Sequence, residues 1–211
     1  MGALRYSAVV LAAGGSTRMA GRNKLLMPLG GESVIRRTVR AVLEANPVET
    51  VVVTGNSADA VADALAGFDA RIQFNPRHAE GQMTSVAAGV AALEAPCDAV
   101  MVCLGDMALL ESADYTELAE AFAAQSRAAI LVPQRGGMRG NPVVFASSFI
   151  PEVLAGNRNL GCRKLIADHP GDVHAYEPAH DRFFVDLDTP EDYARLCERL
   201  GLPAERAATI D

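Results

Sequence analysis

The chain has 211 residues, half of them apolar, and its 26 acidic against 19 basic side chains give a formal net charge of −7. This length favours one domain, and the acidic balance argues against binding of a nucleic-acid polymer, which requires a broad basic surface. The N-terminus shows no apolar stretch followed by a cleavage site, and no run is apolar over the length of a membrane span, so we expect a cytoplasmic protein without a membrane partner.

Short apolar runs alternate with amphipathic stretches along the chain. The runs predict strands at 7–12, 50–54, 71–74, 99–104, 129–132 and 143–146. The amphipathic stretches predict helices at 33–45, 58–65, 84–93, 114–124, 160–168 and 190–200, the last started by Thr189 and Pro190. This alternation indicates an α/β domain at 1–202, with a mostly parallel sheet covered by helices on both faces, followed by a tail at 203–211. Ligands of such folds bind at the carboxyl ends of the strands.

The loop after the first predicted strand is rich in glycine and carries only positive charge. Gly14 and Gly15 let the backbone approach an anion, and no acid lies among the three cations Arg18, Arg22 and Lys24. The arginine side chain offers a planar fork for phosphate and the lysine a mobile point charge. The spacing matches neither a Walker A loop nor a dinucleotide-binding fingerprint. We therefore expect a phosphate site of another type.

Carboxylates follow two later segments. Asp106 comes directly after the predicted strand 99–104, where it would face the same crevice as the cationic loop, although an aspartate there can equally serve as a turn residue. Asp186 and Asp188 alternate on an extended stretch, so they would share a face if that stretch is a strand. Carboxylates beside a phosphate loop are suited to a Mg²⁺ ion that bridges nucleotide oxygens.

These segments resemble the nucleotidyltransferases of the molybdenum-cofactor group. The resemblance lies in LAAGGSTRMAGRNK (11–24), GDM (105–107) and DLDTPED (186–192), with further similarity in GQMTSVAAGV (81–90) and RGNPVVF (139–145). LAAG at 11–14 is similar to the cytidylyl branch, because the guanylyl branch usually carries LAGG. The chain departs from the family at Ala108, where a proline is usual, and at Asn159, where an acid is usual.

The resemblance implies a Rossmann-like fold of the nucleotide-diphospho-sugar transferase type. It also implies Mg²⁺-dependent transfer of CMP from CTP to the terminal phosphate of molybdopterin or molybdenum cofactor, with release of pyrophosphate. A molybdoenzyme or its maturation chaperone would receive the product. The attacking phosphate is mostly ionised at neutral pH, so no general base is needed, and we expect His78, His169, His174 and His180 to lie outside the chemistry.

The resemblance also assigns residues to roles. Lys24 would hold the α-phosphate and Arg18 the departing phosphates, while Asp106 and Asp188 would bind the metal, with Asp186 a weaker candidate. The nucleotide would lie against Leu11, Ala12, Ala13, Gly14, Gly15, Gly81 and Ser85. The acceptor would contact Arg139, Gly140, Asn141 and Arg163.

Other functions remain open at this point. The chain could be a guanylyltransferase of the same family, or a nucleotidyltransferase acting on a sugar phosphate or an isoprenoid precursor. It could also be a non-catalytic carrier of a pterin cofactor. Release of pyrophosphate separates an enzyme from a carrier, and the identity of the acceptor separates the enzymes. The four cysteines have no paired spacing typical of a zinc site, and we expect them to be plain thiols.

Overall fold

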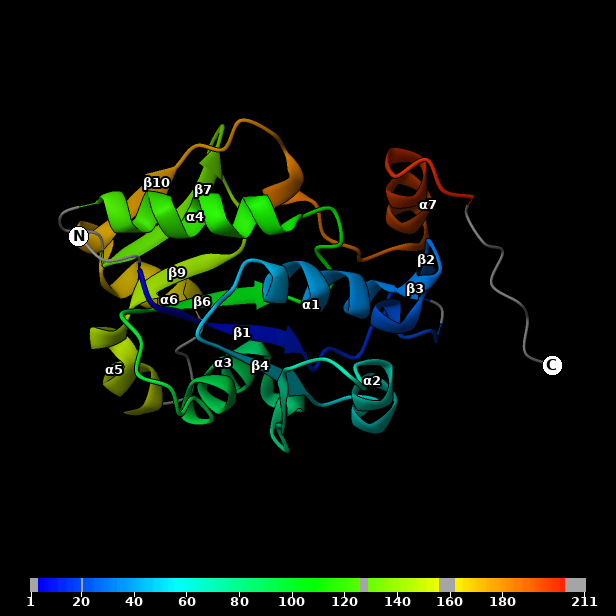
Figure 1. Cartoon of the computed structure of the whole chain (residues 1–211), viewed down its shortest axis with the longest axis horizontal. Coiled ribbons are helices and arrows are strands. Elements are labelled where there is room, and N and C mark those ends of the chain that lie inside the picture. The colour runs from blue at the N-terminus through cyan, green and yellow to red at the C-terminus, as the bar shows by residue number, and fades with distance from the viewer. Residues whose placement is uncertain (1–3, 20, 126–128, 156–161, 204–211) are drawn as a thin grey trace.

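The protein is described by a computed structural model at residues 4–19, 21–125, 129–155 and 162–203. An eight-stranded sheet runs through it in the order β10-β7-β9-β6-β1-β4-β5, with β8 paired to β7 (Figure 1). The strands are β1 (Tyr6–Ala12), β4 (Glu49–Thr54), β5 (Arg71–Phe74), β6 (Ala99–Leu104), β7 (Ile130–Arg135), β8 (Met138–Arg139), β9 (Val143–Ala146) and β10 (Val173–Tyr176). β9 lies antiparallel to β6 and β7, and β8 antiparallel to β7, whereas the other pairs are parallel. The predicted α/β class with a mostly parallel sheet is confirmed.

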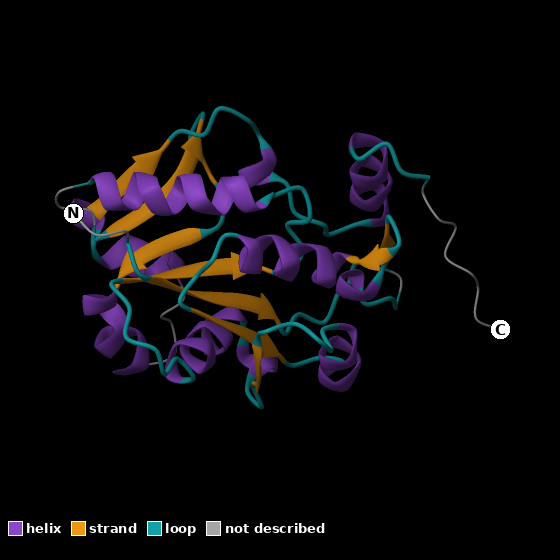
Figure 2. Cartoon of the chain, viewed as in Figure 1, coloured by secondary structure: helices purple, strands orange, loops and turns teal. Residues whose placement is uncertain are grey.

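Helices cover both faces of this sheet (Figure 2). They are α1 (Val34–Glu44), α2 (Ala58–Ala64), α3 (Gln82–Ala91), α4 (Ser112–Ala124), α5 (Ile150–Ala155), α6 (Cys162–Asp168) and α7 (Pro190–Arg199). Successive residues of a strand point to opposite faces, so Val10 packs in the cluster formed with α1 and α4, and Val9 packs in the one formed with α3, α5 and α6. Within the described ranges, no helix has the length and apolar character needed to cross a bilayer.

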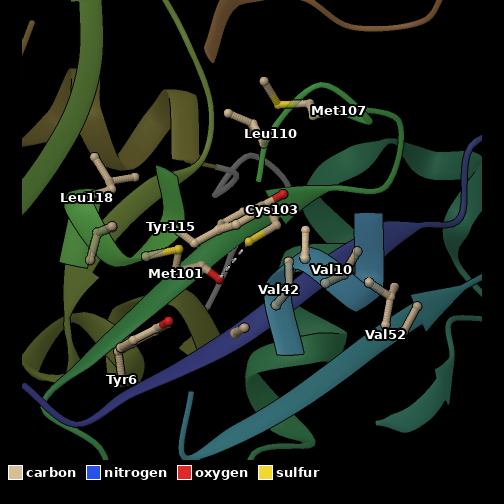
Figure 3. Packing of buried hydrophobic residues seen from close by; sticks show 14 of the residues in the cluster. Tyr6, Val10, Val42, Val52, Met101, Cys103, Met107, Leu110, Tyr115 and Leu118 are labelled. Atoms are coloured by element: carbon tan, nitrogen blue, oxygen red, sulfur yellow. Dashed lines mark hydrogen bonds between the residues drawn. The ribbon is translucent and has the colours of Figure 1, made fainter. Parts of the chain in front are cut away.

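The α1 and α4 side of the sheet forms the larger core (Figure 3). Val42 of α1 and Tyr115 and Leu118 of α4 lie over side chains of β1, β4 and β6, among them Val52 and Met101. All five side chains are at most 1% exposed. This packing holds β1, β4 and β6 rigidly, and the carboxyl ends of these strands position the loops that carry the predicted site.

Several elements differ from the sequence prediction. The helix expected at 84–93 begins earlier, at Gln82, and ends at Ala91, and the one expected at 160–168 starts outside the described residues. The edge strand β10 and the helix α5 were missed, because the four residues of β10 form no apolar run and the six residues of α5 are too few to show a repeating helical pattern. A hairpin of β2 (Pro28–Leu29) and β3 (Glu32–Ser33) was missed for the same reason. All but the first residue of the expected tail lies outside the described residues.

Candidate active site

A cavity of about 840 Å³ opens where the strands end. It gathers most of the residues predicted for a nucleotide, a metal and an acceptor: Leu11, Ala13, Gly14, Lys24, Gly81, Ser85, Asp106, Asp186, Asp188, Arg139, Gly140, Asn141 and Arg163. Three predicted residues are not part of its wall. Ala12 is buried in β1, Gly15 is exposed, and Arg18 reaches the site only through Asp188.

Lys24 is at the centre of this cavity. Its Nζ donates to Asp106 Oδ2 at 2.5 Å and to Asp188 Oδ1 at 2.8 Å, and the side chain is only 16% exposed. Arg18 donates from Nη2 to the other oxygen of Asp188 at 2.6 Å. The two predicted phosphate-binding cations are therefore held on the two predicted metal-binding carboxylates.

Local sequence places Lys24 there. The Asn23 side chain accepts a hydrogen bond from the backbone N–H of Leu25 at 3.0 Å and so caps a short 3₁₀ turn at Lys24–Leu26. The backbone N–H of Lys24 donates to Ser16 Oγ at 3.1 Å, which closes the cationic loop on itself. These bonds fix the direction in which the lysine leaves the loop.

Asp106 is placed by a close contact between two strand ends. Gly105 N donates to Leu11 O at 3.0 Å, and a Cβ on Gly105 would lie 3.0 Å from that oxygen and 2.9 Å from a methyl group of Ile35. Glycine therefore lets the chain turn tightly against β1 before the aspartate. The carboxyl group emerges beside Lys24 as a consequence.

The stretch at 185–188 is extended but is not a strand of the sheet. Leu187 is 1% exposed and packs with Met19, Tyr193 and Leu196, which joins this stretch to α7 and to the first loop. Asp186 and Asp188, on either side of it, both line the cavity. The two aspartates face the same cavity, as expected. The reason is that Leu187 between them packs into the core, and not that the stretch pairs in a sheet.

Charges at the centre alter one another's protonation. Burial opposes the charge on Lys24, but Asp106 and Asp188 outweigh it and raise the pKa of Lys24. The hydrogen bond from Lys24, acting against desolvation, lowers the pKa of Asp188. Asp186 is exposed overall, yet desolvation of its carboxyl group and the neighbouring charges of Asp106 and Asp188 raise its pKa. Lys24 is therefore a fixed cation between carboxylates.

The carboxylates fit a divalent cation. Asp106 is 6% exposed, and its Oδ1 is buried with no hydrogen-bond partner among the described residues. An unpaired buried carboxylate oxygen is costly, and Mg²⁺ or Mn²⁺ prefers such hard oxygen ligands. Asp188 and Asp186 supply further carboxylate oxygens to the same cavity.

The two ends of the cavity differ in chemistry. On the β4 and β5 side, the wall includes Ala13, the start of α3 and Ser85, whose Oγ accepts from Asn75 Nδ2 at 3.0 Å. Gly81 at the N-cap of α3 has no side-chain cap bond, and the backbone N–H of Thr84 donates to Gly81 O at 3.2 Å. The N–H groups of Gln82 and Met83, the first two of the helix, have no partner among the described residues. On the β7 and β9 side, Arg139 and Arg163 line the cavity, and neither makes an ion pair within the described ranges. This side is suited to an anionic molecule.

His78 is a cavity residue that the sequence prediction missed. The histidines were all expected outside the chemistry, but His78 lines the cavity at the end of β5. Its position in a short connection between a predicted strand and a predicted helix, three residues before Gly81, was the available signal.

The other histidines with assigned partners lie elsewhere. His169 pairs with Glu152 at 2.9 Å, and His180 Nε2 pairs with Asp114 Oδ1 at 2.8 Å. Asp114, Glu117 and His180 bring possible metal ligands within 4.8 Å of one another. However, Arg182 also contacts Asp114 at 3.3 Å, and the other oxygen of Asp114 caps α4 by accepting from the backbone N–H of Glu111. Both oxygens of Asp114 therefore already have partners, and we interpret the cluster as structural rather than as a metal site.

Curated relatives include nucleotidyltransferases with different acceptors. The chain is 35% identical to the bifunctional protein GlmU of Agrobacterium fabrum over 59% of its own length, but it spans only 28% of that relative. It is 24% identical to the molybdenum cofactor cytidylyltransferase of Escherichia coli, covering 90% of this chain and 95% of the relative. It is 28% identical to the 2-C-methyl-D-erythritol 4-phosphate cytidylyltransferase of Prochlorococcus marinus, covering 93% and 86%.

Solved structures show the same fold. A nucleotidyl transferase from Methanothermobacter superposes with a TM-score of 0.80 at 27% identity, covering 94% of this chain and 98% of that one. The Mycobacterium tuberculosis protein Rv0371c, solved in complex with manganese, superposes with a TM-score of 0.72 at 23% identity, covering 92% and 98%. The family model of the MobA-like NTP transferase domain matches residues 8–173. The chain therefore belongs to the MobA-like NTP transferase family.

Proposed function

We propose that this nucleotidyltransferase transfers the cytidylyl group of CTP to the terminal phosphate of a molybdopterin-type cofactor and releases pyrophosphate. The choice of CTP is supported by the LAAG sequence at 11–14 and by the similarity to the molybdenum cofactor cytidylyltransferase over nearly the whole of both chains. Delivery of the product to a molybdoenzyme or its chaperone is part of the same proposal.

The centre formed by Lys24, Asp106 and Asp188 carries this proposal. In nucleotidyl transfer, a phosphate oxygen of the acceptor attacks the α-phosphorus while the bond to pyrophosphate breaks, and negative charge accumulates on the oxygens between them. A buried lysine held at this point stabilises that charge, because a fixed cation in a desolvated cavity needs little reorganisation. Arg18, which pairs with Asp188 at the exposed edge, would retain the departing phosphates.

A divalent ion fits beside this lysine. Asp106 and Asp188 would hold it, with Asp186 as a further ligand, and its chemistry when bound is to neutralise phosphate oxygens and polarise the bond to phosphorus. In the protein as described, Lys24 spans Asp106 and Asp188. Lys24, when not held by these carboxylates, would contact a phosphate oxygen. The manganese complex of Rv0371c supports a divalent ion in this fold.

The acceptor end favours a flat molecule over a polyol. Besides Arg139 and Arg163, the cavity wall includes Val132, Val143 and Ile166. Aliphatic side chains leave the hydroxyl groups of a sugar without partners but pack well on the face of a heterocycle. The arginines would then bind anionic or carbonyl groups at the edge of a pterin ring.

An erythritol phosphate acceptor is the second candidate. It is favoured by the 28% identity to the 2-C-methyl-D-erythritol 4-phosphate cytidylyltransferase across most of both chains. The aliphatic acceptor wall argues against it, since that substrate is a polyol.

The deciding experiment measures pyrophosphate release from CTP and Mg²⁺ with molybdopterin, molybdenum cofactor or 2-C-methyl-D-erythritol 4-phosphate as acceptor. We expect turnover with a pterin acceptor and none with the erythritol phosphate. GTP in place of CTP tests the base preference, and Asp106→Asn serves as the inactive control. Turnover with the erythritol phosphate alone would replace the proposal, and binding of a pterin without pyrophosphate release would indicate a carrier.

A further inference from the structure

His78 lies at a defined point on the edge of the cavity. It follows β5, the edge strand, which is two strands from β1 in the sheet order β1-β4-β5. The next strand toward the Lys24 loop is β4, and Gly55 at its end lies between His78 and Ala13. A nucleoside attached to a phosphate at Lys24 has two directions in which to extend, toward His78 or toward Arg139 and Arg163.

Charge and shape separate the two directions. The β7 and β9 side holds two arginines without ion pairs among the described residues, which suits the anionic acceptor. The His78 side is lined by small side chains, by the uncapped start of α3 and by Met83. In-line transfer sets the acceptor oxygen opposite the departing pyrophosphate, and the nucleoside is a separate branch of the α-phosphate. With the acceptor on the side of the two arginines, the nucleoside is left the His78 side, which includes Ala13 of the LAAG sequence.

The imidazole of His78 is the only aromatic ring in the described wall of this cavity. Neither of its nitrogens has a hydrogen-bond or ion-pair partner among the described residues, and the one ring near it is Phe74, tilted at a centroid distance of 6.5 Å. Its backbone is fixed, since His78 N donates to Asn75 O at 3.2 Å and His78 O accepts from Gly81 N at 3.3 Å. The backbone of His78 is therefore held in place, while its ring nitrogens are left without a partner in the described part of the protein.

Gly55 makes this position possible. A Cβ on Gly55 would lie 2.5 Å from His78 Cβ and 2.8 Å from Ala13 Cβ, so only glycine lets the two side chains approach across the end of β4. Ala13 and His78 thus flank one short stretch of wall.

We propose that the His78 ring packs against the nucleobase of the bound nucleoside triphosphate and positions it, an inference that rests on the proposed nucleotidyltransferase function but not on the identity of the acceptor. A flat ring gains stacking energy with any base, so His78 supplies affinity for the nucleoside. The free backbone N–H groups of α3 and the shape of the wall at Ala13 are left to select the base.

The test compares two ligands in three variants. Calorimetry with Mg²⁺ measures CTP, which has a base, and tripolyphosphate, which has none. We expect His78→Ala to weaken CTP binding about 5- to 100-fold, the range for loss of one base-stacking ring, and to leave tripolyphosphate within twofold. His78→Phe, which keeps a flat ring, should restore CTP binding to within about threefold of the unaltered protein. His174→Ala, a histidine of β10 outside the cavity wall, is the control and should change neither ligand.

Unchanged CTP binding in His78→Ala would overturn the proposal. So would an equal loss of CTP and tripolyphosphate, which would mean a structural role, or a His78→Phe variant as weak as His78→Ala. If the unaltered protein binds neither CTP, GTP, UTP nor ATP, the nucleotidyltransferase function fails with it. If the protein binds another of these nucleotides in place of CTP, that nucleotide is compared with tripolyphosphate in the same three variants.

Discussion

Replacing Lys24 with methionine should destabilise the metal-free protein and make its stability depend on Mg²⁺. The substitution keeps the length of the side chain but removes the cation between Asp106 and Asp188, whose side chains are 7% and 29% exposed. Breaking a buried ion pair by removing one partner costs about 3–5 kcal/mol, and we take about 3 kcal/mol because Arg18 still pairs with Asp188. At about 2–4 °C per kcal/mol for a chain of this size, the Tm should fall by about 6–12 °C.

Mg²⁺ should recover most of this loss. An ion present at 100 times its Kd adds about 2.7 kcal/mol, and in the variant it no longer has to displace an ammonium group. In the unaltered protein it must displace Lys24, so the shift with Mg²⁺ alone should be smaller. Thermal unfolding with EDTA and with Mg²⁺ measures both effects.

The control is Lys164→Met, which removes the only other lysine. Lys164 pairs with Asp168 on the surface of α6, with the two side chains 42% and 38% exposed. Such exposed pairs contribute about 0–1 kcal/mol, so this variant should unfold within about 4 °C of the unaltered protein at either metal level. A Lys24→Met variant with an unchanged Tm, or with a Mg²⁺ shift equal to that of the unaltered protein, would refute the reasoning.

Four further predictions concern single residues. Asp106→Asn should reduce Mg²⁺-dependent pyrophosphate release by at least about 100-fold while circular dichroism stays unchanged, because the amide oxygen can still accept from Lys24 but brings no negative charge to a metal ion; normal turnover would exclude it as a metal ligand. Arg163→Ala should raise the KM for the acceptor about 10- to 150-fold and leave the KM for the nucleotide unchanged, since loss of one charge-assisted bond costs about 1.5–3 kcal/mol; an effect on the nucleotide alone would reverse the two ends of the cavity. Gly89→Ala should destabilise the protein by about 1–3 kcal/mol in urea unfolding, because its Cβ would lie 2.3 Å from a methyl group of Val9 in β1, and a neutral effect would mean that α3 can shift. Burial raises the pKa of the Cys162 thiol to about 12, so it is protonated at pH 8 and should resist iodoacetamide although it lines the cavity; rapid alkylation in a mass-spectrometric time course would contradict this.

Features that depend only on neighbouring residues could be predicted from the sequence. The apolar runs at 7–12, 50–54 and 99–104 are β1, β4 and β6 with only small changes of boundary, because a strand buried on both faces must be apolar throughout. Thr189 starts α7 as predicted, with its Oγ1 accepting from Asp192 N at 3.2 Å and the carboxylate of Asp192 accepting from Thr189 N at 2.8 Å. Local hydrogen bonding decides such a helix end, so neighbouring residues suffice to predict it.

Elements that form only through contact with distant parts of the chain could not be predicted from the sequence. β10 has a half-exposed, mixed sequence and is a strand only because the edge of β7 is available to it. The orientation of Asp186 and Asp188 likewise depends on Leu187 packing against α7, a contact made within the tertiary structure.

The sequence by itself determined the fold class, the cationic loop and the acids that could accompany it, since these follow from periodicity, composition and motif spacing. Only the tertiary structure decided that Lys24 bridges Asp106 and Asp188 across 82 and 164 residues of chain, and that His78 lines the same cavity. Contacts over such separations depend on the order of strands in the sheet, and strand order has no local signal in the chain.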